Sequence, residues 1–257
     1  MKTVIKQAKN KKWKKRLMIS TPTLGIIRYE WAQAKYGQVI PVNWENSGFD
    51  CKYEKALDFV PVGFSIDDAY NMITYQAIKA DVEWLLIIED DVCIPPTCYV
   101  KMGAYMDKGD IPVVSGLYYL KGEPTVPLIF KGNGNGAFTD FKKGDKVWVD
   151  GVPMGCLLIH MSILKTMHAE AEVYTTHEGN KLKKVFETPR HQFIDPETLT
   201  MMNVMGTQDL DWCRKIKTRG ILKKAGWAKI ARRKYPFLCD TSIFCKHIDI
   251  NTGKQYP

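Results

Sequence analysis

The feature that most constrains this sequence is an apolar run, Trp84–Ile88, which leads directly into three consecutive acids. Side chains alternate between the two faces of a β-strand, so a strand that is apolar at every position must be covered on both faces. The run therefore predicts a central strand in a sheet that has helices on each side. Open α/β sheets bind their ligands outside the carboxyl ends of the strands, where these acids lie.

The segments that precede the run predict the same class of fold. Residues 17–20 and 59–62 have the composition of strands, and Pro61 favours an edge position for the second. Ser65 and Asp68 form a capping box at the start of a helix. The buried face of this helix is expected to carry Ile66, Ala69, Ile73 and Ala77. The order of elements predicts an α/β fold with a mixed, mainly parallel sheet flanked by helices.

The second half of the chain has a different pattern. Short β-like runs separated by turn residues between positions 112 and 160 predict a small antiparallel β-meander attached to the α/β core. Residues 170–206 show no period and are expected to form a loop over the site. Thr207 is expected to cap a late helix, and a final strand over residues 241–245 leads to His247.

Three carboxylates at one strand end, Glu89, Asp90 and Asp91, repel one another unless a cation compensates them. The alternation of a strand directs Glu89 and Asp91 to one side and Asp90 to the other. Two oxygen ligands at short range suit Mg²⁺ or Mn²⁺, with water and a diphosphate completing the coordination. A solvated acidic turn is an equally simple interpretation of the acids taken alone.

Other candidate positions lie further along the chain. Gly151 and Gly155 precede an apolar run, a pattern typical of a close backbone approach to a ligand or of a tight turn. Asp209 lies in the first turn of the late helix, where it is either a general base or an acid that only interacts favourably with the helix dipole. The helix N-terminus favours the ionised carboxylate and is therefore expected to lower the basicity of Asp209. Asp211 is expected to serve the dipole alone. His247 is a candidate metal ligand, although a given histidine is more often structural.

Positive charge is concentrated at the N-terminus. The net charge is +9, and residues 1–16 hold eight lysines and arginines and no acid. We expect a disordered tail that makes at most weak contact with a polyanion or a membrane surface, followed by one domain over residues 17–257. No apolar run reaches the ~20 residues of a membrane helix, so we expect no transmembrane segment. Cysteines outside any C-x-x-C pair favour a reducing, cytoplasmic compartment without disulfides or a zinc site.

In their order along the chain, these motifs resemble those of glycosyltransferases with the GT-A (Rossmann-like) fold, particularly the family-2-like branch found in bacteria and viruses. The turn Thr21-Pro22-Thr23 is similar to the turn that holds the nucleotide base in that family. Asn71 matches the end of an Ala-Arg-Asn motif in which Tyr70 replaces the arginine.

The remaining matches follow the same order. Glu89-Asp90-Asp91 corresponds to the D-x-D element, with Glu89 in place of the first Asp. Pro153-Met154-Gly155-Cys156 resembles a Gly-x-Gly-Cys stretch that precedes an apolar strand. Gln208-Asp209 resembles a Glu-Asp pair that opens a late helix, and His247 stands where a late histidine completes the metal shell.

The resemblance implies transfer of a sugar from a UDP- or GDP-linked donor to a hydroxyl of an unidentified glycan, lipid or protein. It implies Mn²⁺ or Mg²⁺ held by Asp91 and His247, with Glu89 as a further ligand, to neutralise the leaving diphosphate. It implies Asp209 as the general base of an inverting reaction. The positions that it assigns to the nucleotide sugar are Thr21, Pro22, Thr23, Asn71, Glu89, Asp90 and Gly155.

Two other functions stay open at this point. A nucleotidyltransferase uses a related sheet and metal-binding acids, but the first strand here lacks the glycine-rich phosphate loop that such an enzyme needs. A catalytically inactive protein that binds a nucleotide sugar or a glycan is the other alternative, because Tyr70, Glu89 and Gln208 depart from the family pattern.

Overall fold

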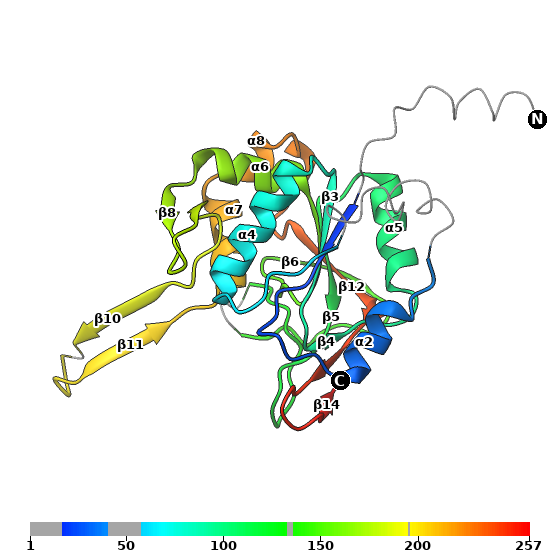
Figure 1. The fold of residues 1–257 in the computed structure, drawn as a ribbon, viewed down its shortest axis with the longest axis horizontal. Helices are drawn as coiled ribbons and strands as arrows, with labels where there is room; N and C mark the ends of the chain where they lie inside the picture. The colour runs from blue at the N-terminus through cyan, green and yellow to red at the C-terminus, as the bar shows by residue number, and fades with distance from the viewer. Residues whose placement is uncertain (1–16, 41–57, 133–135, 195) are drawn as a thin grey trace, which may run out of the picture.

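The computed structural model describes residues 17–40, 58–132, 136–194 and 196–257, and the basic tail expected at residues 1–16 lies outside this range. The centre is a seven-stranded sheet with helices on both faces (Figure 1). Its strands lie in the order β2 (Asp58–Phe59), β1 (Leu17–Ser20), β3 (Trp84–Ile88), β7 (Cys156–His160), β5 (Val113–Leu117), β12 (Phe237–Phe244) and β6 (Lys146–Val149). Strands β7 and β6 run opposite to the others, so the sheet is mixed and mainly parallel, as predicted.

The apolar run Trp84–Ile88 is a central strand. Strand β3 lies between β1 and β7, and all of its residues are buried. Its side chains divide between two hydrophobic cores: Leu85 and Ile87 belong to one, and Trp84, Leu86 and Ile88 belong to the other. The prediction of a strand covered on both faces is therefore confirmed.

Helices supply the two covers. Side chains of α4, α6, α7 and α8 pack in the core on one face of the sheet, and those of α2 and α5 pack in the core on the other face (Figure 1). None of the helices in the described ranges is long and apolar enough to cross a membrane. The bounds of the helices are α2 (Tyr29–Tyr36), α4 (Ile66–Lys79), α5 (Cys98–Lys108), α6 (Met161–Glu170), α7 (Gln208–Thr218), α8 (Ile221–Lys224) and α9 (Ala228–Ala231).

Helix α4 begins as predicted, with one half of the capping box. The hydroxyl oxygen of Ser65 accepts the backbone N–H of Asp68 at 3.4 Å. The carboxylate of Asp68 does not return to the cap, because it accepts a hydrogen bond from the hydroxyl of Tyr174 instead. Ile66 was expected on the buried face but is exposed, whereas Ala69, Ile73 and Ala77 are buried as expected.

Small antiparallel sheets are present, but they are not formed by the segments expected to make the meander. Strands β5, β6 and β7, which fall between residues 112 and 160, join the central sheet. The loop expected over residues 170–206 is also wrong, because that segment forms two hairpins, the second of which projects away from the sheet (Figure 1). The small sheets pair β8 (Val173–Thr175) with β9 (Lys181–Lys183), β10 (Arg190–Ile194) with β11 (Met201–Met205), and β13 (Lys246–Ile248) with both β4 (Val92–Cys93) and β14 (Gln255–Tyr256).

Candidate active site

The acids that follow β3 lie beside the late strand β13. Because β4 pairs antiparallel with β13, Val92 lies opposite His247. The backbone N–H of Ile248 donates to the carbonyl oxygen of Asp91 at 2.7 Å. This pairing brings together Asp91 and His247, which are 156 residues apart in the sequence.

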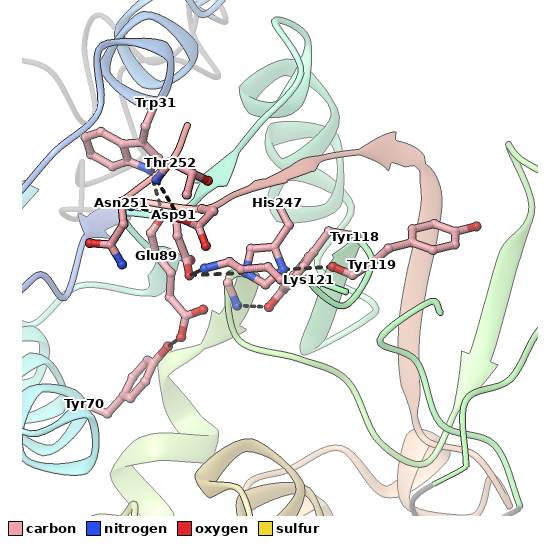
Figure 2. Close-up of polar contacts among 12 residues, drawn as sticks. Trp31, Tyr70, Glu89, Asp91, Tyr118, Tyr119, Lys121, His247, Asn251 and Thr252 are labelled. Carbon is pink, nitrogen blue, oxygen red and sulfur yellow. Dashed lines mark hydrogen bonds and ion pairs between the residues drawn. The ribbon is translucent and has the colours of Figure 1, made fainter. Parts of the chain in front are cut away.

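The ring of His247 is held in one orientation. Its Nδ1 lies 2.8 Å from the carbonyl oxygen of Tyr119, and its Nε2 lies 3.2 Å from Oδ2 of Asp91 (Figure 2). A carbonyl oxygen can only accept, so Nδ1 carries a proton, and in a neutral ring Nε2 then presents a lone pair to the carboxylate. A proton or a metal cation between these two atoms would make the contact favourable. Metal-binding histidines commonly donate their other N–H to a carbonyl in this way.

One oxygen of the Asp91 carboxylate lacks a hydrogen-bond partner among the described residues. Its Oδ1 is buried and has no hydrogen-bond partner, a state that costs free energy. Burial pushes the pKa of Asp91 upward, but its contacts with His247 and Lys121 outweigh burial and hold the pKa below the ordinary value of 3.8. Asp91 is therefore an ionised group in a largely buried position.

A divalent cation fits the residues around Asp91. One carboxylate and one imidazole are ligands that Mn²⁺ accepts, and a diphosphate and water complete such a shell. In the part of the chain that the structure describes, there is no group of three or more His, Cys, Asp or Glu residues that could hold a metal ion. Asp91 and His247 could therefore supply two ligands of such an ion, and the others would have to come from outside the protein.

Lys121 is a member of the site that the sequence analysis missed. Its ammonium group forms an ion pair with the same Oδ2 of Asp91 that His247 approaches (Figure 2). Lys121 follows the buried segment that contains Tyr118, in a loop that the backbone bond from Leu120 N–H to the carbonyl of Val126 closes at 2.8 Å. In the sequence it stood in a Lys-Gly-Glu-Pro turn, and no local pattern distinguished it from a solvated lysine.

Glu89 points to a different partner from that of Asp91. The hydroxyl of Tyr70 donates to Oε1 of Glu89 at 2.5 Å (Figure 2). Burial, followed by the negative charge of Asp91, raises the pKa of Glu89 to about 8. Tyr70, which stands where the family has an arginine, therefore serves as a hydrogen-bond donor to an acid that is protonated at neutral pH.

Asp90 connects the acidic turn to the first strand. Burial raises its pKa, and a hydrogen bond from Thr23 opposes that shift. Thr21 in the same turn accepts a hydrogen bond from the buried Lys35 at 3.2 Å, and Lys35 forms an ion pair with Asp58 at 3.0 Å. The structure therefore brings Asp90 together with Thr23 of the turn Thr21-Pro22-Thr23, and the three residues of that turn are buried.

Asn71 has its hydrogen bonds satisfied within the protein. Its side-chain oxygen accepts the backbone N–H groups of Val185 and Phe186, each at 2.9 Å. Its side-chain nitrogen donates to the carbonyl of Phe186 and to the hydroxyl of Tyr174. These bonds anchor the 185–186 segment on α4, and they account for the asparagine without a ligand.

Gly155 lies where a side chain has no room. A Cβ atom there would lie 2.5 Å from the hydroxyl oxygen of Tyr118 and 2.6 Å from Cγ2 of Val92. Its N–H donates to Tyr118 at 2.8 Å, and its carbonyl accepts the N–H of Glu89 at 3.0 Å. Close packing behind the acidic turn therefore explains this glycine, and its backbone fixes the position of Glu89.

Asp209 lies in the wall of a cavity of about 670 Å³. Its Oδ1 accepts the N–H of Leu210 at 2.8 Å. Burial raises the pKa of Asp209 and outweighs the hydrogen bonds from Thr207 and Leu210. Hydrogen bonds at the helix N-terminus lower the pKa, as expected, but burial outweighs them, so the net change is a gain of basicity. The cavity is lined by Leu120, Val126, Pro127, Leu128, Phe130, Ala137, Asp150, Gly151, Pro189, Gly206, Thr207, Asp209, Leu210, Asp211, Arg214, Lys217 and Thr218.

The cavity lies near the acidic turn, although no residue of that turn lines it. Asp209 is close enough to Glu89 for its charge to contribute to the raised pKa of that residue. Leu120, the neighbour of Lys121 in sequence, also lines the cavity. A molecule in the cavity would therefore have the base candidate on one side and the candidate metal site nearby.

Asp211 does not serve the helix dipole alone, as the sequence analysis expected. Its carboxylate is buried and forms ion pairs with Lys215 at 2.7 Å and Arg214 at 2.5 Å. Lys215 in turn contacts Glu187 at 3.2 Å. The spacing of Asp211 and Lys215, four positions apart on one helix, was a signal that could have revealed this pair.

Comparison with known proteins gives a fold and no sequence family. No protein-family model matches the chain, and no curated protein matches it in sequence. Two partial structural likenesses, at TM-scores of 0.38 and 0.25, are too distant to bear on function. They are S. aureus TarS, 14% identical over 63% of this chain and 31% of that chain, and a glycosyltransferase involved in the glycosylation of the major capsid of PBCV-1, 11% identical over 59% and 64%.

One solved structure resembles the chain over nearly its whole length. It is A197 from STIV, at 13% identity, with a TM-score of 0.51 over 94% of this chain and 93% of that chain. Such a likeness establishes the fold alone. The chain therefore has the mixed α/β fold of GT-A type that the sequence predicts.

Proposed function

We propose that the chain is a metal-dependent glycosyltransferase that transfers a sugar from a UDP- or GDP-linked donor to the hydroxyl of an acceptor, with inversion. The observation that carries the proposal is one juxtaposition at the ends of the strands. Asp91, which has a buried oxygen without a partner, meets His247 there, and Asp209, with a raised pKa, lies in the wall of a nearby cavity.

Each part of this site has a chemical role in the transfer. When bound, Mn²⁺ or Mg²⁺ would neutralise the charge that develops on the leaving diphosphate. Asp91 and His247 would hold that ion, and the turn Thr21-Pro22-Thr23 with Asp90 would hold the nucleoside. The cavity would take the acceptor, with the hydroxyl that reacts beside Asp209.

In the proposed reaction Asp209 is the one group that accepts a proton. The acceptor oxygen forms a bond to the anomeric carbon, and the bond from that carbon to the diphosphate oxygen breaks. The electron pair of the broken bond leaves with the diphosphate. The acceptor proton passes to Asp209, whose raised pKa improves its basicity. Attack from the side opposite the leaving group inverts the configuration.

The test is Asp209→Asn, which keeps the shape of the side chain and an oxygen that can accept the N–H of Leu210. Release of nucleoside diphosphate from UDP- and GDP-linked sugars is measured with water as the acceptor. Loss of a general base lowers kcat by about 10²–10⁴-fold, and we expect the affinity for Mn²⁺ and nucleoside diphosphate to stay unchanged.

The matched control is Asp110→Asn, which removes an exposed acid that pairs only with the surface residue Lys108 in the described contacts. Its kcat is expected to equal that of the wild type. Equal rates for Asp209→Asn and this control would contradict the assignment of the base. Loss of nucleotide affinity in Asp209→Asn would instead identify Asp209 as a binding group.

A further inference from the structure

Lys121 and a divalent ion would need the same atom of Asp91. The ammonium group of Lys121 already contacts Oδ2, and Nε2 of His247 lies 3.2 Å from that oxygen (Figure 2). A divalent ion bound between Asp91 and His247 would therefore lie close to the positive charge of the Lys121 ammonium group. Two like charges in a partly buried site repel strongly.

Lys121 is able to leave Asp91. Its side chain is 29% exposed, whereas that of Asp91 is 21% exposed and is fixed on the β4–β13 side of the sheet. A lysine carries its charge on a flexible four-carbon stem and binds phosphate as a point charge. A donor diphosphate at the metal site would thus offer Lys121 a second anionic partner within reach of the same loop.

We propose that Lys121 couples metal binding to donor binding, an inference that rests on the proposed function. Without donor, its ammonium group neutralises Asp91 and excludes the divalent ion. When the diphosphate binds, Lys121 moves to a phosphate oxygen and frees Oδ2 of Asp91 for the metal. The coupling is reciprocal, so the metal raises the affinity for nucleoside diphosphate by the same factor.

The experiment measures Mn²⁺ affinity directly, without turnover. Free Mn²⁺ is counted by electron paramagnetic resonance during titration of the full chain, alone and with saturating UDP or GDP. The variants are Lys121→Met, which keeps the apolar stem without the charge, and Lys121→Gln, which keeps a polar end. The control is Lys254→Met, which removes an exposed lysine that pairs with Glu123 in the same loop as Lys121.

In the wild type, nucleoside diphosphate is expected to raise the Mn²⁺ affinity by about tenfold or more, within the usual range of such coupling. Both Lys121 variants are expected to bind Mn²⁺ alone about tenfold more tightly than the wild type and to lose most of the coupling. Lys254→Met is expected to behave as the wild type. Circular dichroism shows which variants are folded, and either Lys121 variant alone decides the result.

Failure of the inference and failure of the proposed function give different results. If Asp91→Ala abolishes Mn²⁺ binding but the Lys121 variants bind Mn²⁺ alone no more tightly than the wild type, the coupling role of Lys121 is overturned and the metal site stands. If the wild type binds no Mn²⁺ even with UDP or GDP, the metal-dependent function is overturned, and the role of Lys121 is overturned with it.

Discussion

Glu89→Gln is expected to stabilise the protein near neutral pH, because the wild-type carboxyl holds a proton in the folded state. Burial and the charge of Asp91 raise its pKa from 4.5 to about 8. In the unfolded chain the carboxyl ionises near its ordinary pKa, so folding at pH 7 requires the uptake of a proton. The two pKa values imply that stability falls by about 3 kcal/mol between pH 4.5 and pH 7 because of this group.

The direction of the pH dependence follows from the raised pKa. The stabilising contribution of the protonated group is fully present below pH 4.5 and is lost as the pH rises toward about 8. Glutamine does not ionise, and its side-chain oxygen can still accept the hydroxyl of Tyr70. The variant is therefore expected to exceed the wild type by about 3 kcal/mol at pH 7 and to differ little at about pH 5.

Urea unfolding in the presence of a chelator, at about pH 5, 7 and 9, measures this difference. The control is Glu123→Gln, which removes an exposed acid whose pKa is lowered by its hydrogen bond with Lys254. Relative to the wild type, Glu123→Gln is not expected to gain stability as the pH rises. If the free energy of unfolding depends on pH in the same way for the wild type and Glu89→Gln, then Glu89 is not a protonated, neutral acid in the folded state.

Two further variants test the surroundings of the site by urea unfolding. Gly155→Ala is expected to cost about 1–3 kcal/mol, because its Cβ would lie 2.5 Å from Tyr118 and 2.6 Å from Val92; wild-type stability would show that the backbone yields there without cost. Asp211→Asn is expected to cost about 2–3 kcal/mol, since it removes the nearest anionic partner of the buried ammonium of Lys215 and leaves only the contact with Glu187 among the described ion pairs. A loss of only about 1 kcal/mol, typical of a surface pair, would show that Lys215 finds compensation.

Local sequence patterns predicted those helices and strands whose position depends on a few neighbouring residues. The central strand β3 was predicted because it is apolar at every position. Helix α4 was predicted because Ser65 and Asp68 mark its start. Pro61 predicted an edge strand or a strand end; β2 lies at the edge of the sheet and ends at Phe59, before this proline. These features depend on a residue and its close neighbours, so the sequence alone is sufficient to reveal them.

Pairing between distant segments was not visible in the same way. Strand β5 has the short, turn-bounded pattern of a meander strand, but it lies parallel to β12, more than a hundred residues later in the chain. An alternating or apolar run shows that a segment forms a strand and leaves its partner undetermined. The expected meander was therefore assigned to strands that complete the central sheet.

Some residues of the candidate site could be predicted from the sequence, and others depended on contacts between distant segments. The resemblance to a family pointed to Asp91 and His247, and the pairing of β4 with β13 brings these two together. Lys121 was missed because its partner Asp91 is thirty residues earlier and no motif joins them. Asn71 and Gly155 stand at family positions, yet their bonds and packing are accounted for within the chain. The resemblance named candidate residues, and the contacts show how each of their side chains is held.

The most direct test of the proposed function is a turnover measurement on the wild-type chain. UDP- and GDP-linked sugars are incubated with the protein in Mn²⁺ or in a chelator, and nucleoside diphosphate release is followed. Nucleoside triphosphates are incubated in parallel and assayed for pyrophosphate. A glycosyltransferase is expected to release nucleoside diphosphate from at least one sugar donor, only with the metal, and no pyrophosphate. Pyrophosphate release from a triphosphate, or no turnover of any sugar donor with Mn²⁺, would contradict the proposal.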